Sequence, residues 1–76
     1  MNLDIEIKKL NFALDSYPCK MVASYTAKKT DLKNKDYTLE LKNSDGDLLL
    51  SFGGPEITES DLYEFKKESI SLCTHE

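Results

Sequence analysis

The sequence contains no arginine and a single histidine, His75. Arginine provides the planar, bidentate donor that dominates recognition of phosphates and base edges, so its absence argues against a nucleic-acid-binding protein. A catalytic serine or cysteine needs a positioned base beside it, and the only histidine stands next to the end of the sequence. The chain therefore offers little of the chemistry on which catalysis and nucleic-acid recognition depend.

Long apolar runs and glycine-rich loops are also missing. No apolar stretch approaches the roughly 20 residues that cross a membrane. Residues 53–55, Gly-Gly-Pro, lack the lysine and the serine or threonine that follow in a phosphate-binding loop. The first residues, MNLDIEIKK, are acidic where a signal peptide would be basic and then apolar. We expect a cytoplasmic protein without membrane association.

Only two cysteines are present, Cys19 and Cys73. Thiols in a reducing compartment stay reduced, so we expect both to be free. A bridge between them is the alternative, and it would require the last helix to end near the start of the first strand.

What the chain does have is the composition of a folded domain, with 39% apolar and 32% charged residues. Its 76 residues make one small domain, residues 1–76. A chain of this length buries only about 60% of its unfolded surface, which leaves little room for an enclosed active site.

Apolar residues recur at alternating spacings of four and three along residues 3–17: Leu3, Ile7, Leu10, Leu14 and Tyr17. This spacing predicts a helix, with Asn2 as its N-cap and the residue before Pro18 as its end. A strand over residues 3–8 is the alternative, because every second residue there is apolar. The helix is favoured, since its pattern covers more of the chain.

Two segments alternate between apolar and polar residues, 20–28 and 36–42, and predict strands. The second runs into an Asp-Gly pair at residues 45–46, which predicts a two-residue hairpin turn. With this turn Leu41 lies opposite Leu50, and the following pairs also place apolar side chains on one face.

A second helix is predicted after residues 53–55. Thr58 is its N-cap and Asp61, three residues on, completes a variant of the capping box. Its apolar stripe is predicted to consist of Leu62, Phe65 and Leu72.

The predicted fold is α+β, a three-stranded antiparallel sheet with an N-terminal and a C-terminal helix (α-β-β-β-α) on one face. The other sheet face is expected to be solvated. This order over residues 3–72 resembles the double-stranded-RNA-binding domain. That family places lysines at the start of its second helix, where residues 58–61 here are Thr-Glu-Ser-Asp. The resemblance implies the fold, and the reversed charge argues against the RNA-binding role.

Candidate metal ligands have a simpler explanation. Asn43, Asp45 and Asp47 match the first positions of an EF-hand loop, but Leu48 and Gly54 stand where that loop needs glycine and glutamate. The hairpin turn explains the same residues. We therefore expect no metal, no cofactor and no catalytic residues, and hence no enzyme.

Charge is divided unevenly along the chain. Residues 1–43 carry eight lysines and six acidic residues, and residues 44–76 carry two lysines and eight acidic residues. Asp61, Glu64 and Glu68 form a stripe on the predicted second helix. A one-sided acidic surface on a small protein suggests a partner protein with a basic surface.

The predicted first helix has a second apolar set, Ile5 and Phe12, on the side opposite its main stripe. A helix on a sheet cannot bury both stripes, so this pair is a candidate contact patch for a partner or for a homodimer. A strand at residues 3–7, or a loop covering the helix, would remove the patch.

These features favour a small acidic protein-binding module that is not an enzyme. Such a module would inhibit or block a larger partner, for example as a phage or mobile-element anti-defence protein acting on a nucleic-acid-handling enzyme. Its expected partner-binding residues are Asp61, Glu64, Glu68, Ile5 and Phe12. One alternative is a nucleic-acid-binding domain that uses the lysines of residues 28–35, and another is a structural or assembly subunit, as a monomer or a homodimer.

Overall fold

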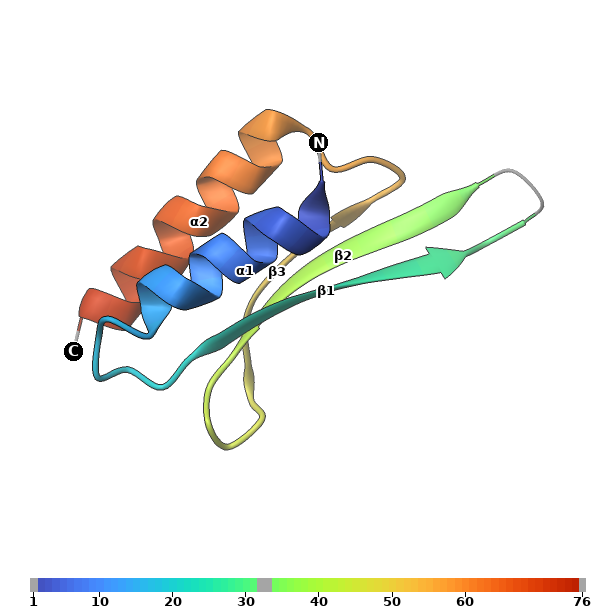
Figure 1. The fold of residues 1–76 in the computed structure, drawn as a ribbon. Helices are drawn as coiled ribbons and strands as arrows, with labels where there is room; N and C mark the ends of the chain where they lie inside the picture. Colours follow the sequence, from blue (N-terminus) through green and yellow to red (C-terminus); the bar gives the residue numbers. More distant parts are fainter. Residues whose placement is uncertain (1, 32–33, 76) are drawn as a thin grey trace.

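The computed structural model describes residues 2–31 and 34–75 (Figure 1). Its elements are α1 (Leu3–Leu14), β1 (Val22–Lys29), β2 (Lys35–Lys42), β3 (Leu48–Gly54) and α2 (Glu59–Thr74). The strands form one antiparallel sheet in the order β1-β2-β3. Both helices lie on one face of this sheet, with α1 against β1 and α2 against β3. The predicted α-β-β-β-α fold is confirmed.

Residues 3–8 belong to α1, so the strand alternative for this segment is wrong. The Asn2 side chain accepts a hydrogen bond from the backbone N–H of Ile5 at 3.4 Å, which caps the helix as expected. Ile7, Leu10 and Leu14 are buried against the sheet. The helix ends at Leu14, three residues before the predicted end.

The turn between β2 and β3 differs from the predicted two-residue hairpin turn. Asn43 pairs with Asp47 through the Asn43 N–H and the Asp47 carbonyl, and residues 44–46 form a three-residue loop. The Asn43 side-chain oxygen also accepts hydrogen bonds from the N–H groups of Asp45 and Asp47, both at 3.0 Å. Gly46 has φ +85°, the left-handed conformation that such a loop requires.

The predicted strand register is nevertheless correct, since Leu41 lies opposite Leu50 and Leu39 opposite Phe52. A β-bulge between Leu41 and Lys42 compensates for the longer loop. A slip of one residue would have turned the apolar side chains of β3 toward solvent, so burial decides the register rather than the turn.

Phe65 of α2 lies at the centre of the core and is 0% exposed. Its ring contacts Phe52 of β3 edge to face, with ring centroids 5.8 Å apart. The buried residues on α2 are Leu62, Phe65, Ser69 and Cys73. The predicted stripe is therefore wrong at Leu72, which is 41% exposed.

Ser69 is a buried hydroxyl without a hydrogen-bond partner in the described part of the chain. We expect Ser69→Ala to stabilise the protein by about 1–2 kcal/mol, because it removes an unsatisfied polar group and improves helix propensity. Urea unfolding followed by circular dichroism measures this change. Ser71→Ala, at an exposed position of the same helix, is the control and should change stability by a few tenths of a kcal/mol at most. A lower urea midpoint for Ser69→Ala than for the native protein would contradict this expectation.

Cys19 and Cys73 form a disulfide, with their Cα atoms 5.2 Å apart. The expectation of free thiols is wrong in the structure. The two helices run side by side in the same direction, so the loop after α1 and the last turn of α2 meet at one end of the molecule (Figure 1). The bridge ties these two segments together.

Candidate protein-binding surfaces

The three residues of the acidic stripe on α2, Asp61, Glu64 and Glu68, differ in their structural roles. Asp61 belongs to the capping box, in which its carboxylate accepts a hydrogen bond from the Thr58 N–H and its own N–H donates to the Thr58 hydroxyl, both at 3.1 Å. Glu64 and Glu68 are exposed and have no such role among the described residues. Helix initiation thus explains Asp61 but leaves the charges of Glu64 and Glu68 unexplained.

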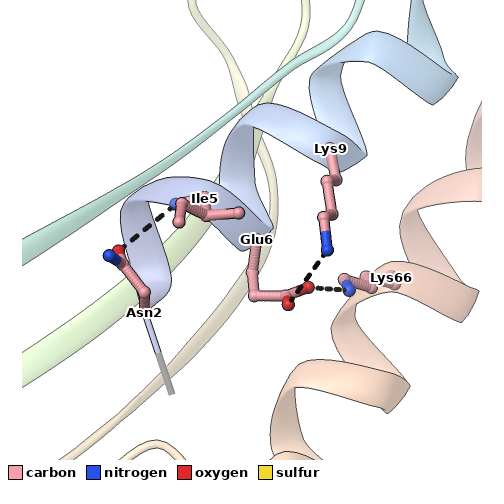
Figure 2. A network of polar contacts seen from close by, with 5 residues as sticks. All are labelled: Asn2, Ile5, Glu6, Lys9 and Lys66. Carbon is pink, nitrogen blue, oxygen red and sulfur yellow. Dashed lines mark hydrogen bonds and ion pairs between the residues drawn. The ribbon is translucent and has the colours of Figure 1, made fainter.

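The direction of Glu64 and Glu68 follows from an ion pair between the helices. Lys66 contacts Glu6 of α1, which places Lys66 on the side of α2 that faces α1 (Figure 2). Residues that are two apart in the sequence of a helix point in directions about 200° apart around its axis, and Glu64 and Glu68 are each two residues from Lys66. Glu64 and Glu68 therefore lie on the side of α2 away from α1, and Glu64, nearly opposite the buried Leu62 and Cys73, also points away from the sheet. We call this side, with Glu64 and Glu68, the acidic flank.

The Glu6 carboxylate contacts two ammonium groups, that of Lys66 and that of Lys9, which is 3.8 Å away (Figure 2). The hydrogen bond that Lys66 donates lowers the pKa of Glu6, and partial desolvation opposes this effect. The stabilisation from this pair is therefore present above the ordinary carboxyl pKa and is lost as the pH falls through the lowered value.

Ile5 and Phe12 lie on the outer side of α1, where Ile5 is 49% and Phe12 80% exposed. Neither a strand at residues 3–7 nor a covering loop buries them, so the predicted exposure is confirmed. They point away from the sheet, whereas the acidic flank points away from α1. The structure does not bring the two predicted surfaces together into one patch.

An open groove of about 770 Å³ lies where the β1–β2 hairpin passes the start of α1. Its lining includes Leu3, Tyr25, Tyr37 and Ile57. The Tyr25 hydroxyl donates a hydrogen bond to Asp4 at 2.8 Å, which raises the pKa of Tyr25. Neither a histidine nor a cysteine is among the described residues that line this groove.

The described residues contain no group of three or more histidine, cysteine, aspartate or glutamate residues that could hold a metal ion. They also contain no helix long and apolar enough to cross a membrane.

The β1–β2 hairpin extends beyond both helices (Figure 1). Lys28, Lys29 and Lys35 are exposed near its tip, and Lys29 lies opposite Lys35 in the strand register. Lys33, the fourth lysine of the predicted cluster, lies outside the described residues. The structure therefore places a small basic area at the end of this hairpin, far from the acidic flank.

The solvent face of the sheet is less polar than expected. Val22 is 58%, Leu48 53% and Leu49 37% exposed. Leu48 and Leu49 stand at the bulge of β3, and the sequence signal for them was the run of three leucines that interrupts strict alternation. Strand alternation places Val22 and Leu49 on this face, so the sequence missed Leu48 and the apolar character of the area.

The expected resemblance to the double-stranded-RNA-binding domain rests on the element order alone. Glu59 and Asp61 occupy the first turn of α2, so the charge reversal expected at this helix start is present in the structure. Comparison of the chain with protein families, curated proteins and solved structures found no match.

Proposed function

We propose that this chain is a protein-binding module without enzymatic activity, which acts by covering a basic surface of a larger protein. The observation that supports the proposal most is the acidic flank. Glu64 and Glu68 are exposed, and within the described residues they accept no hydrogen bond and form no ion pair. Like charges four residues apart on a helix destabilise it by a few tenths of a kcal/mol, which a basic partner would reverse.

The charge distribution also suits fast association with such a partner. Residues 44–76 have a net charge of −6, and complementary fields raise association rates and disfavour wrong partners. Enzymes that handle nucleic acids present basic surfaces to their substrates. An inhibitor of such an enzyme, for instance an anti-defence protein of a phage or mobile element, is the form of this function that we favour.

Within this proposal the protein acts in the cytoplasm, where the Cys19–Cys73 bridge would be exposed to reducing thiols. The proposed mechanism has no redox step of its own, but it requires the folded domain, so reduction of the bridge would act on binding through the stability of the fold.

Charge reversal on the acidic flank should weaken partner binding. The partner would be captured from the native host, identified by mass spectrometry and purified. We expect Glu64→Lys with Glu68→Lys to raise its Kd at least tenfold at low ionic strength. Asp15→Lys with Asp36→Lys changes the net charge equally at exposed positions away from the flank and should have a much smaller effect. Equal effects of the two double variants would contradict the proposal.

Nucleic-acid binding through the hairpin tip is the second candidate, supported by the exposed Lys28, Lys29 and Lys35. We expect no gel shift of duplex RNA or DNA at low salt with tens of micromolar protein. A shift that Lys28→Glu with Lys29→Glu abolishes would instead favour this candidate.

A further inference from the structure

The two edges of the sheet are not equivalent. At the β1 edge, the Asn11 side chain accepts a hydrogen bond from the Ala23 N–H and donates one to the Ala23 carbonyl, both at 2.8 Å. The backbone groups of Ala23 thus point away from β2. Its partner across the ladder, Leu41, must therefore direct its own backbone groups to the other side, toward Leu50 of β3.

This alternation fixes which groups β3 leaves free. Backbone N–H and C=O groups of successive strand residues point to opposite sides, so if those of Leu50 bond to β2, those of Phe52 and Gly54 do so too. The N–H and C=O groups of Ser51 and Gly53 then point outward from the free edge of β3. Both residues are exposed.

Protection differs between the edges as well. Besides Asn11, the β1 edge carries Lys28 and Lys29 at its end, and charged side chains discourage strand addition. The β3 sequence, Leu-Leu-Leu-Ser-Phe-Gly-Gly, contains no charged residue and no proline. The bulge distorts only its first residues. The β3 edge is therefore the one suited to pair with another strand.

The surroundings of this edge indicate the chemistry of an added strand. On the helix side, α2 packs against β3 and carries the acidic flank, with the exposed Leu72 one turn after Glu68. On the solvent side of the sheet stand the exposed Leu48 and Leu49. An incoming strand alternates its side chains between these two sides.

We propose that β3 accepts an extended segment of the partner protein as a fourth strand, with basic side chains toward α2 and apolar side chains toward Leu48 and Leu49. This inference rests on the proposed function and specifies how the acidic flank is used. A second copy of the chain suits the edge less well. Pairing of β3 with itself about a two-fold axis would place the two acidic flanks, each with Glu64 and Glu68, against one another.

The probe is a synthetic eight-residue peptide that alternates lysine and valine, and its control has glutamate in place of lysine. Hydrogen exchange of the ¹⁵N-labelled protein is followed by NMR. We expect the lysine peptide to slow exchange of the Ser51 and Gly53 amides at least tenfold and to leave the Ala27 amide, on the β1 edge, unchanged. The glutamate peptide should have no effect. Absence of binding at millimolar lysine peptide would overturn the inference.

A proline variant tests the backbone contact itself. Ser51→Pro removes an outward N–H and keeps the bonds to β2, so peptide binding should be lost while the folded spectrum remains. Ala27→Pro does the same on the β1 edge, because Ala27 lies four residues from Ala23, and it should retain binding. If Ser51→Pro does not fold, the exchange measurement on the native protein decides.

Two outcomes would overturn strand pairing in different ways. Peptide binding that survives in folded Ser51→Pro, or that leaves the Ser51 and Gly53 amides unprotected, contradicts strand pairing. If partner binding is then still weakened by Glu64→Lys with Glu68→Lys, the proposed function stands without this inference. A dimer of the protein alone that Ser51→Pro dissociates would make a second copy the occupant and would contradict a basic partner strand.

Discussion

Reduction of the Cys19–Cys73 bridge is expected to lower the free energy of unfolding by about 4 kcal/mol, from the chain entropy of a loop whose ends are 54 residues apart. A domain of this size has a total stability of roughly 4–11 kcal/mol, so the reduced protein keeps about 0–7 kcal/mol and at the lower end of this range is at the limit of folding. Urea unfolding with and without dithiothreitol measures the difference.

The control for this experiment is the double variant Cys19→Ala with Cys73→Ala. It should match the reduced protein within about 1 kcal/mol, aside from the small volume lost at the buried Cys73, and should not respond to dithiothreitol. An oxidised protein whose urea midpoint does not change on reduction would show that the bridge does not stabilise the fold.

Phe65→Ala is expected to cost about 3–5 kcal/mol, because it empties the centre of the core and removes the contact with Phe52. Tyr63→Ala is the matched control, since Tyr63 is an aromatic residue of the same helix that is 65% exposed. The control should cost less than about 1 kcal/mol. Both are measured by urea unfolding of the oxidised protein.

At the lower end of the expected stability, the cost of Phe65→Ala equals the whole stability of the domain and leaves the chain unfolded. Phe65→Leu then provides the measurable value, at a cost of about 1–2 kcal/mol from partial repacking. Equal costs for the Phe65 and Tyr63 variants would contradict the position of Phe65 at the centre of the core.

The hairpin between β2 and β3 shows which sequence signal is stronger. The Asp-Gly pair predicted a two-residue turn, but Asn43 offers its side chain to two backbone N–H groups and stabilises a longer loop. The apolar pattern predicted that Leu41 faces Leu50, and the bulge preserves this pair. Register was predictable because burial of a whole strand face depends on it, whereas the local turn was not.

On α2 the sequence indicated a helix and its capping box correctly, but not all of its buried side. Ser69 was left out of the predicted buried stripe because serine is polar, although it continues the helical spacing from Leu62 and Phe65 to Cys73. Leu72 replaced it in the prediction and is exposed instead. A small side chain fits where the helix lies close to its neighbours, and only the packed structure reveals such a place.

Features that depend on how the helices and strands are placed relative to one another, such as the disulfide bridge, could not be predicted from the sequence. The bridge requires the direction of the two helices relative to each other, which no local pattern of residues specifies. The surface features were predictable in part, since the helical periodicity placed Ile5 and Phe12 on the side opposite the buried stripe, and both are exposed. That Glu64 and Glu68 lie on the side of α2 away from α1 follows only from the contact of Lys66 with Glu6.

The most direct test of the acidic flank as a binding surface is the Kd of the captured partner at about 50 mM and about 500 mM salt. Screening of a charge-dominated contact predicts at least tenfold weaker binding of the native protein at the higher salt. Glu64→Lys with Glu68→Lys should bind weakly at both concentrations, with little salt dependence. A native Kd that is the same at both salt concentrations, and unchanged in the double variant, would contradict an acidic binding surface.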